Sequence, residues 1–216
     1  MSELLLELLS EEIPARMQRR AAKDLERAVT RALKEAGLEF STTQAFSTPR
    51  RLTLFVEGLP TEQPDVIVER KGPRADAPEK AIAGFLKSVG LERDAVEERD
   101  TDKGKVLYAV LLQQGRPAAQ VIGEILPTAL AAIGWPKSMR WGAYEMKWVR
   151  PLHAILCMFE GEVVPFTFGH LTAANMTAGH RIHQPHRIIV NNVSDYRLYL
   201  DAAKVMFDDR QRERVI

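Results

Sequence analysis

The sequence contains a single cysteine, Cys157, so no disulfide can form within the chain. A reducing compartment suits such a protein, and we expect a cytoplasmic location. No apolar run approaches the length that spans a bilayer. The leucine-rich start is interrupted by glutamates and has neither a basic segment nor a cleavage site, which argues against a signal peptide. We therefore expect no membrane partner.

The chain also lacks a charge excess of either sign. Thirty Lys and Arg residues against 29 Asp and Glu residues give a net charge of +1. Overall charge therefore cannot identify a partner, and any affinity for nucleic acid must come from a local patch. The 216 residues are 45% hydrophobic and 27% charged, which is ordinary for a globular protein of one large or two small domains.

Motifs that hold nucleotides or catalytic metals are missing too. The sequence has no Walker glycine loop, no dinucleotide fingerprint and no HExxH pair. His180, His183 and His186 fall at three-residue steps, but Pro185 prevents a helix through them, and no cysteine or close carboxylate completes a zinc site. No nucleophile stands with a base and an orienting group. We predict no catalytic residue, no metal and no cofactor in this chain.

Hydrophobic periodicity predicts an α+β fold with mostly antiparallel sheets, two long helices packed on them and a helical tail. The predicted strands span residues 3–10, 40–48, 51–59, 66–71, 96–100, 105–113, 152–160, 163–168 and 186–191. The predicted helices span residues 15–36, 78–89, 117–133 and 195–216. Residues 101–104 form the turn of a hairpin. Pro127 should kink or break its helix, and Ser194 should cap the last one.

Three parts follow from this pattern. Residues 1–73 form an N-terminal α+β lobe, and residues 74–193 form a second α+β lobe. The boundary lies in the stretch 72–78, which is rich in Pro, Ala and charge. Residues 194–216 begin a helical region in which seven of the last nine residues, 208–216, are polar or charged and no cap or turn signal follows, as in the front part of a longer protein.

The most distinctive stretch is residues 133–153, which we call the tryptophan-rich segment. It holds every tryptophan of the chain, namely Trp135, Trp141 and Trp148. Four cations are interleaved with them: Lys137, Arg140, Lys147 and Arg150. Cations bind phosphates and flat rings stack on unpaired bases, so this pattern suits a nucleic acid. The alternative is that the rings anchor a core while the cations are solvated. We expect a short strand near residues 138–141.

Two other basic motifs are suited to gripping an anion. Arg50 and Arg51 stand where two predicted strands meet, and their planar guanidinium groups can bind a phosphate or a carboxylate in two-point fashion. Structural pairing with the acidic turn Glu11–Glu12 is the equal alternative. His180 and Arg181 form a second anion grip or, equally, a structural tie.

Seven stretches carry a resemblance to a known family. They are LLLELLSEEIP near the start, FSTPRRLTLFVEGL, ERKGP, TDKGKVLYA, PKSMRWG, WVRPLHAIL and GHRIHQP. With these stretches in this order and at this spacing, the chain resembles the N-terminal part of the β subunit of bacterial heterotetrameric glycyl-tRNA synthetase. One departure is Ile182, where family members have an aromatic residue after the GHR triplet.

The resemblance implies a division of labour. The α subunit would carry the catalytic core, with ATP and magnesium, that activates glycine and transfers it. The β subunit would contribute tRNA binding and be required for aminoacylation. The expected partners of this chain are therefore the α subunit, tRNA-Gly and the rest of the β subunit, and this N-terminal body would have no aminoacylation site of its own.

From the residues we infer a set of contacts to tRNA or to a neighbouring subunit. The candidates are Arg50, Arg51, Lys137, Arg140, Trp141, Trp148, Arg150, His180 and Arg181. The tryptophans would serve as stacking or packing anchors. A second hypothesis is that these motifs hold the β subunit together and dock it to the α subunit, with tRNA bound elsewhere. Hydrolytic editing has no supporting triad or metal motif and ranks last.

Overall fold

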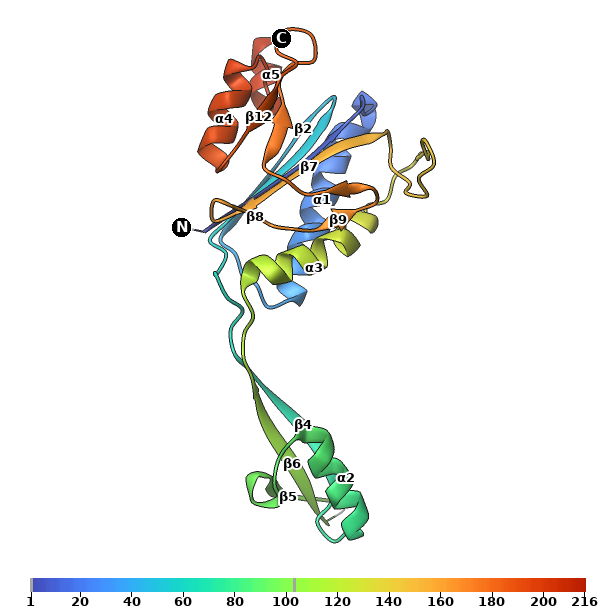
Figure 1. The fold of residues 1–216 in the computed structure, drawn as a ribbon, viewed down its shortest axis with the longest axis vertical. Coiled ribbons are helices and arrows are strands. Elements are labelled where there is room, and N and C mark those ends of the chain that lie inside the picture. Colours follow the sequence, from blue (N-terminus) through green and yellow to red (C-terminus); the bar gives the residue numbers. More distant parts are fainter. Residues whose placement is uncertain (1, 103) are drawn as a thin grey trace. The chain divides into compact units, whose positions relative to one another are not determined.

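A computed structural model describes residues 2–102 and 104–216 of the chain. The chain forms two compact units. Unit 1 runs to Gln63 and resumes at Arg116, and unit 2 spans Pro64–Gly115 (Figure 1). Strand β4 of unit 2, Val66–Arg74, pairs with β6, Gly104–Gln113, so the predicted boundary at residues 73 and 74 falls inside a paired strand. The three-part division, as a statement about separate domains, stays a prediction.

Unit 1 is built on a five-stranded antiparallel sheet in the order β2-β3-β1-β7-β8. These strands are β1 Glu3–Ser10, β2 Thr42–Thr48, β3 Arg51–Glu57, β7 Leu152–Phe159 and β8 Glu162–Val163. Strand β1 is central, with β3 on one side and β7 on the other. Its run of apolar residues fits this place, because both faces of a central strand are covered.

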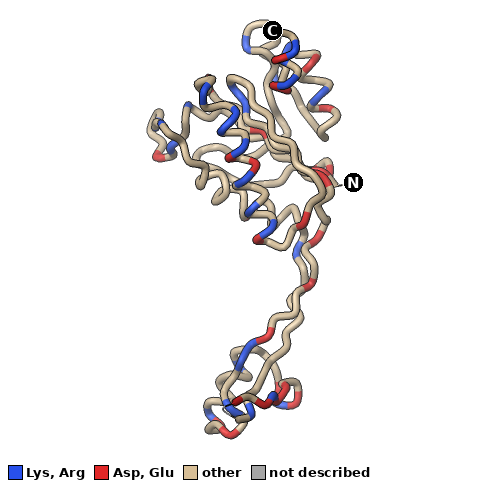
Figure 2. Tube along the Cα trace, turned by 180° about the vertical axis from the view of Figure 1, so that it is seen from behind, with Lys and Arg blue, Asp and Glu red and all other residues tan. Residues whose placement is uncertain are grey.

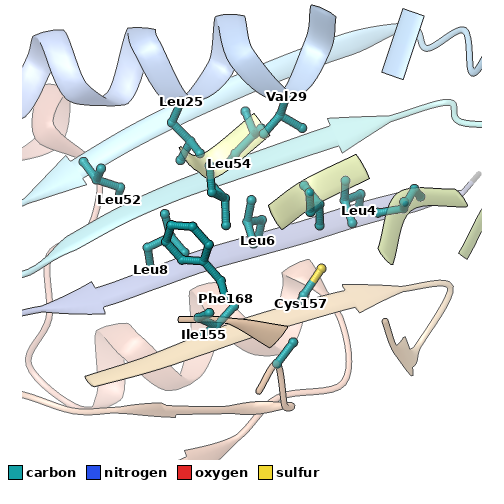
Figure 3. Packing of buried hydrophobic residues seen from close by; sticks show 14 of the residues in the cluster. Leu4, Leu6, Leu8, Leu25, Val29, Leu52, Leu54, Ile155, Cys157 and Phe168 are labelled. Atoms are coloured by element: carbon teal, nitrogen blue, oxygen red, sulfur yellow. The ribbon is translucent and has the colours of Figure 1, made fainter. Parts of the chain in front are cut away.

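Two helices cover one face of this sheet. They are α1, Ala15–Glu35, and α3, Ala118–Ala131. Figure 3 shows Leu25 and Val29 of α1 packed with Leu6 and Leu54 of the sheet. Even-numbered leucines of β1 join this core, because side chains alternate between the two faces of a strand.

The opposite face of the sheet is covered by α4, Val193–Ala202. Leu5 and Phe55 of the sheet pack there with Tyr196 and Leu200 of the helix. Four short strands and a last helix complete unit 1: β9 Thr167–Phe168, β10 Leu171–Thr172, β11 Met176–Ala178, β12 Arg187–Ile189 and α5 Asp209–Val215.

Unit 2 is a three-stranded sheet in the order β4-β6-β5 with one helix. Besides β4 and β6 it contains α2 Glu79–Val89, a 3-10 turn at Arg93–Ala95 and β5 Glu97–Thr101. Its buried residues are Val106, Leu107 and Ala109 of the middle strand. Strands β5 and β6 confirm the predicted hairpin, although Lys103 in its turn lies outside the described residues.

The structure confirms the α+β class, the antiparallel sheets and the two long helices. It also corrects local details. The break predicted at Pro127 does not occur: α3 is one helix, with buried Leu126 and Leu130 on either side of the proline. The last region is capped by Asn192 and not by Ser194, since the Asn192 side chain accepts a hydrogen bond from the Asp195 amide at 2.8 Å.

Two predicted strands are also shorter or absent. The strand expected at residues 138–141 is reduced to one bridge, in which Met139 pairs with Trp148. Met139 and Trp148 exchange two backbone hydrogen bonds, and Trp148 itself is buried in the core. The strand predicted at residues 163–168 is divided, because β8 ends at Val163 and β9 begins at Thr167. Strand β4, in contrast, continues through Gly72 to Arg74.

Candidate functional site

Five segments of unit 1 form one cavity, which we call the basic cleft. They are the loop between β1 and α1, the β2–β3 turn, the turn after β11, the loop after α4 and helix α5. The cavity has a volume of about 470 Å³. Its charged or titratable lining side chains are Arg50, Arg51, His180, Arg181, Lys204, Arg212 and a single carboxylate, Glu12. The structure thus brings together the two predicted motifs, Arg50–Arg51 and His180–Arg181.

Arg51 is the buried wall of the basic cleft. It is 5% exposed, and its Nε donates to the Glu7 carboxylate on the neighbouring strand at 3.1 Å. Its guanidinium also donates to the carbonyl of Ala178, at the end of β11. These bonds hold Arg51 in place, so it positions the turn after β11 and has little freedom to bind a ligand.

A buried polar network surrounds that ion pair. Glu7 accepts hydrogen bonds from the hydroxyls of Thr177 and Tyr196, and Tyr196 also contacts the Thr53 hydroxyl at 2.8 Å. Burial, and then the negative charge of Glu7, raise the pKa of Tyr196 well above its ordinary value. Tyr196 therefore stays a neutral donor. The network ties β1, β3, β11 and α4 together beneath the cleft.

Arg50 lies at the edge of the basic cleft and is only partly engaged. Its Nε donates to the Ser10 carbonyl at 3.1 Å, and Nη2 lies 3.8 Å from Glu11. Glu11 also bonds His153, at 2.7 Å. That hydrogen bond, and then the charge of Arg50, lower the pKa of Glu11 although partial burial opposes them. Arg50 is therefore close to Glu11, as the structural alternative to anion binding predicted.

The second motif forms a tight turn. Nδ1 of His180 accepts hydrogen bonds from the backbone amides of Ile182 and His183, at 3.3 and 3.2 Å, so its proton lies on Nε2. A Cβ at Gly179 would collide with the Gln184 carbonyl, which explains the glycine before the histidine. Arg181 extends outward, is about half exposed and contacts Glu12 at 3.2 Å.

Two cations of the basic cleft had no signal in the sequence. Lys204 is exposed at a backbone φ of +61° in the turn after α4. Arg212 comes from α5 and donates to the carbonyls of Met206 and Ser47, both at 2.9 Å. Arg212 therefore closes the wall, as Arg51 does, while Lys204 is available to a ligand. Neither belongs to a motif, and only the fold brings them to Arg50.

Trp148 of the tryptophan-rich segment lies in the core of unit 1, and Trp135 and Trp141 are partly buried against that core. Trp148 is 1% exposed and meets Trp135 edge to face, with ring centroids 4.9 Å apart. It also packs on Phe168 at 5.7 Å. Trp141 is half-buried against the same core and contacts His170. Trp148 is thus a packing anchor that cannot stack on a base.

The cations of that segment do not line the basic cleft. Lys137 and Arg140 are exposed, and Arg150 is half-buried with its guanidinium on the Val149 carbonyl at 2.8 Å. These three do not appear among the described residues that line the basic cleft. Their contact with tRNA or a subunit stays a prediction.

Within residues 2–102 and 104–216, no group of three or more His, Cys, Asp or Glu side chains is placed to hold a metal ion. Over the same residues no helix is both long and apolar enough to cross a membrane. Burial raises the pKa of the Cys157 thiol above its ordinary range, so the thiol is neutral and inaccessible.

Comparison with protein families decides the family. Residues 4–216 match the family of the glycyl-tRNA synthetase beta subunit. The chain belongs to that family. Its similarity to a glycine–tRNA ligase beta subunit of Cereibacter sphaeroides is 54% identity over 220 residues, which cover 100% of this chain and 32% of the relative. A relative of the same name in Dinoroseobacter shibae is 52% identical, over 98% of this chain and 30% of its own length.

A third relative, from Paracoccus denitrificans, is 50% identical and is likewise named a glycine–tRNA ligase beta subunit. Its alignment covers all of this chain and 32% of the relative. These matches confirm the resemblance carried by the seven sequence stretches. The chain spans about a third of the length of the curated relatives it matches.

Proposed function

We propose that this chain is the N-terminal body of the beta subunit of a heterotetrameric glycine–tRNA ligase. In this proposal it contributes to tRNA binding and to subunit assembly during ATP-dependent attachment of glycine to tRNA. Family membership supports the ligase part. The observation that carries the tRNA part is the basic cleft, where basic side chains from four segments line a cavity whose described lining includes one carboxylate.

The geometry of the basic cleft suits the binding of a phosphate better than the catalysis of a reaction. Arg51 and Arg212 are held by protein acceptors and form a rigid wall. Arg181 and Lys204 extend into solvent beside it, and Arg50 is only partly engaged. Exposed cations beside a fixed positive wall attract a polyanion but do not recognise its base sequence. ATP and magnesium belong, in this proposal, to the alpha subunit, and the complex works in the cytoplasm with no membrane partner.

A titration of labelled tRNA-Gly tests this function. The full-length beta subunit, with the alpha subunit, is titrated at several salt concentrations and followed by fluorescence anisotropy. Lys204→Ala and Arg181→Ala should each weaken binding and lower the slope of log K against log salt by about one unit. The reason is that a protein with one phosphate contact fewer releases fewer counterions when it binds tRNA. Lys71→Ala, an exposed cation in unit 2, is the matched control.

Unchanged affinity and slope in both cleft variants would refute the tRNA contact. A second candidate function would then hold: a docking body for the alpha subunit that does not touch tRNA. The Arg50–Glu11 and Arg181–Glu12 contacts favour it, because they already use part of the positive charge within the chain. In that case Arg181→Ala should dissociate the two subunits in sedimentation velocity while the tRNA salt slope stays constant.

A further inference from the structure

A long groove runs between α1 and α3 in unit 1. It has a volume of about 810 Å³. A second cavity of about 370 Å³ shares Arg20, Asp24 and Gly134 with it and continues it toward Trp135. Ala28 and Ile125 form part of its floor, which is apolar and half-buried. The groove is long and apolar, although it lies between two charged helix faces.

The α1 side of the groove carries a regular row of cations. They are Arg16, Arg20, Lys23, Arg27, Arg31 and Lys34, and all six are exposed. Their spacing of three or four residues places them on one face of the helix, along about 27 Å. Figure 2 shows basic positions recurring along α1. Four cations of the row, Arg16, Arg20, Arg27 and Arg31, line the groove or its continuation toward Trp135.

The acids beside this row are few and weakly engaged. Asp24 lies 3.5 Å from both Arg20 and Arg27, and Glu35 contacts Arg31 at 2.7 Å. The three arginine side chains are 71 to 77% exposed, so these pairs contribute little and can be exchanged for other carboxylates. The α3 side is different, because it presents Glu124 and Thr128. The two sides of the groove thus differ in charge.

We propose that the groove binds an acidic amphipathic helix of a second protein chain, the alpha subunit of the ligase. The apolar side of that helix lies on the groove floor, as helices dock in hydrophobic grooves. Its carboxylates face the α1 row. A nucleic acid would use the cations but would leave the apolar floor uncovered, so a helix matches both features. This inference rests on the proposed function in one respect, that the two subunits form a complex.

Cross-linking within the purified complex tests the occupant. A photoreactive benzoylphenylalanine replaces Thr128, which lines the groove and is exposed, in the full-length beta subunit bound to the alpha subunit. We expect a cross-link to an alpha-subunit peptide that has Asp or Glu on one face and apolar residues on the other. The same probe at Lys87, on α2 of unit 2, is the control and should give a different pattern.

Charge reversal gives the second readout. Arg27→Glu combined with Arg31→Glu should reduce the cross-link yield at least tenfold, and changing two facing carboxylates of the captured helix to lysine should restore it. Lys80→Glu combined with Lys87→Glu reverses two exposed charges on α2 and should leave the yield unchanged.

Four outcomes would overturn the inference: no cross-link, cross-links confined to the beta chain, cross-links to tRNA, or a captured segment without an acidic face. The Lys204→Ala titration does not involve the groove. A failed cross-link with an intact salt effect would therefore reject the docking helix and keep the proposed function.

Discussion

The tryptophan-rich segment and the basic cleft both begin as basic motifs in the sequence, but the fold uses them in opposite ways. In the segment, Trp135 and Trp148 pack against each other, while Lys137, Arg140 and Lys147 are exposed. In the cleft, basic side chains from four separate segments line one cavity. Clustering along the sequence therefore does not define a site here. The packing of strands and helices does, because it decides which turns and loops lie together.

Magnitudes explain why the tryptophans are buried. Burying about 200 Å² of an aromatic side chain at about 25 cal/mol per Å² stabilises the fold by about 5 kcal/mol. Stacking one base on an exposed ring contributes about 1–3 kcal/mol. Trp148, with Phe168 and Trp135 beside it, gains more as part of the core. Burial of a charged group brings no such stabilisation, so the cations of the segment stay at the surface next to the positions of their backbone.

The largest expected effect comes from the segment. Trp148→Ala should lower the free energy of unfolding by about 4 kcal/mol, because it leaves a cavity in the core. Urea denaturation of the beta subunit, followed by circular dichroism, measures this. Trp141→Ala, at the half-buried ring, is the comparison and should cost clearly less. Equal losses in the two variants would contradict the assignment of Trp148 as the anchor.

The next effect separates the wall of the cleft from its mobile cations. Arg51→Ala should cost about 3 kcal/mol of stability, because it leaves Glu7 buried without its cation. Lys204→Ala, in the same cleft but exposed, should change stability by less than about 0.5 kcal/mol. Thermal unfolding of both variants under identical conditions gives the answer. A stable Arg51→Ala protein would show that Arg51 is free to bind ligands.

A smaller effect tests whether the segment keeps any role in binding. Arg140→Ala and Arg150→Ala should each lower the salt slope of tRNA binding by about one unit, as for any cation that contacts a phosphate. The anisotropy titration described for Lys204 measures it in the complete ligase. If neither the affinity nor the slope changes, the segment is a structural element and the cleft is left as the candidate site.

The smallest effect depends on pH. The hydrogen bond to His153, and then Arg50, hold the pKa of Glu11 below its ordinary value of 4.5. A lowered carboxyl pKa stabilises the fold above pH 4.5, and this contribution is lost as the pH falls through the folded-state value. Glu11→Gln should therefore make the melting temperature less sensitive to acid in that range. Glu39→Gln, at an exposed position after α1, is the control, and identical acid profiles would argue against the contact.

Elements defined by local patterns were predictable from the sequence. Alternation defined β3, and helical spacing with Gly37 after it defined α1. Elements that depend on distant neighbours were not. Nothing near Arg51 shows that its partner is Glu7, which lies on another strand. Asn192 and Ser194 are both good caps, and the start at Asn192 goes with contacts to a distant strand: Val193 is buried, and its amide donates to the Glu3 carboxylate at 2.9 Å.

The residues of the basic cleft likewise include some that local sequence patterns predicted and others that they did not. Its two turns were visible because paired arginines and a glycine–histidine–arginine triplet are unusual at strand ends. Lys204 and Arg212 were not visible, because single cations in a charged C-terminal stretch have no pattern. Their position follows from the packing of Tyr196 and Phe207 on the sheet, a set of contacts between residues far apart in the chain.

The central position of β1 has a consequence for synthesis. Strand β1 precedes the other described elements of this chain, but its partner β7 lies opposite it with Leu4 facing Phe159. Half of its backbone hydrogen bonds must therefore wait until most of this chain has been translated, and closing so long a loop is slow. Among the described residues, the strands of unit 2 pair with one another, and unit 2 ends at Gly115. We expect nascent chains to protect unit 2 from protease well before they protect the first strand.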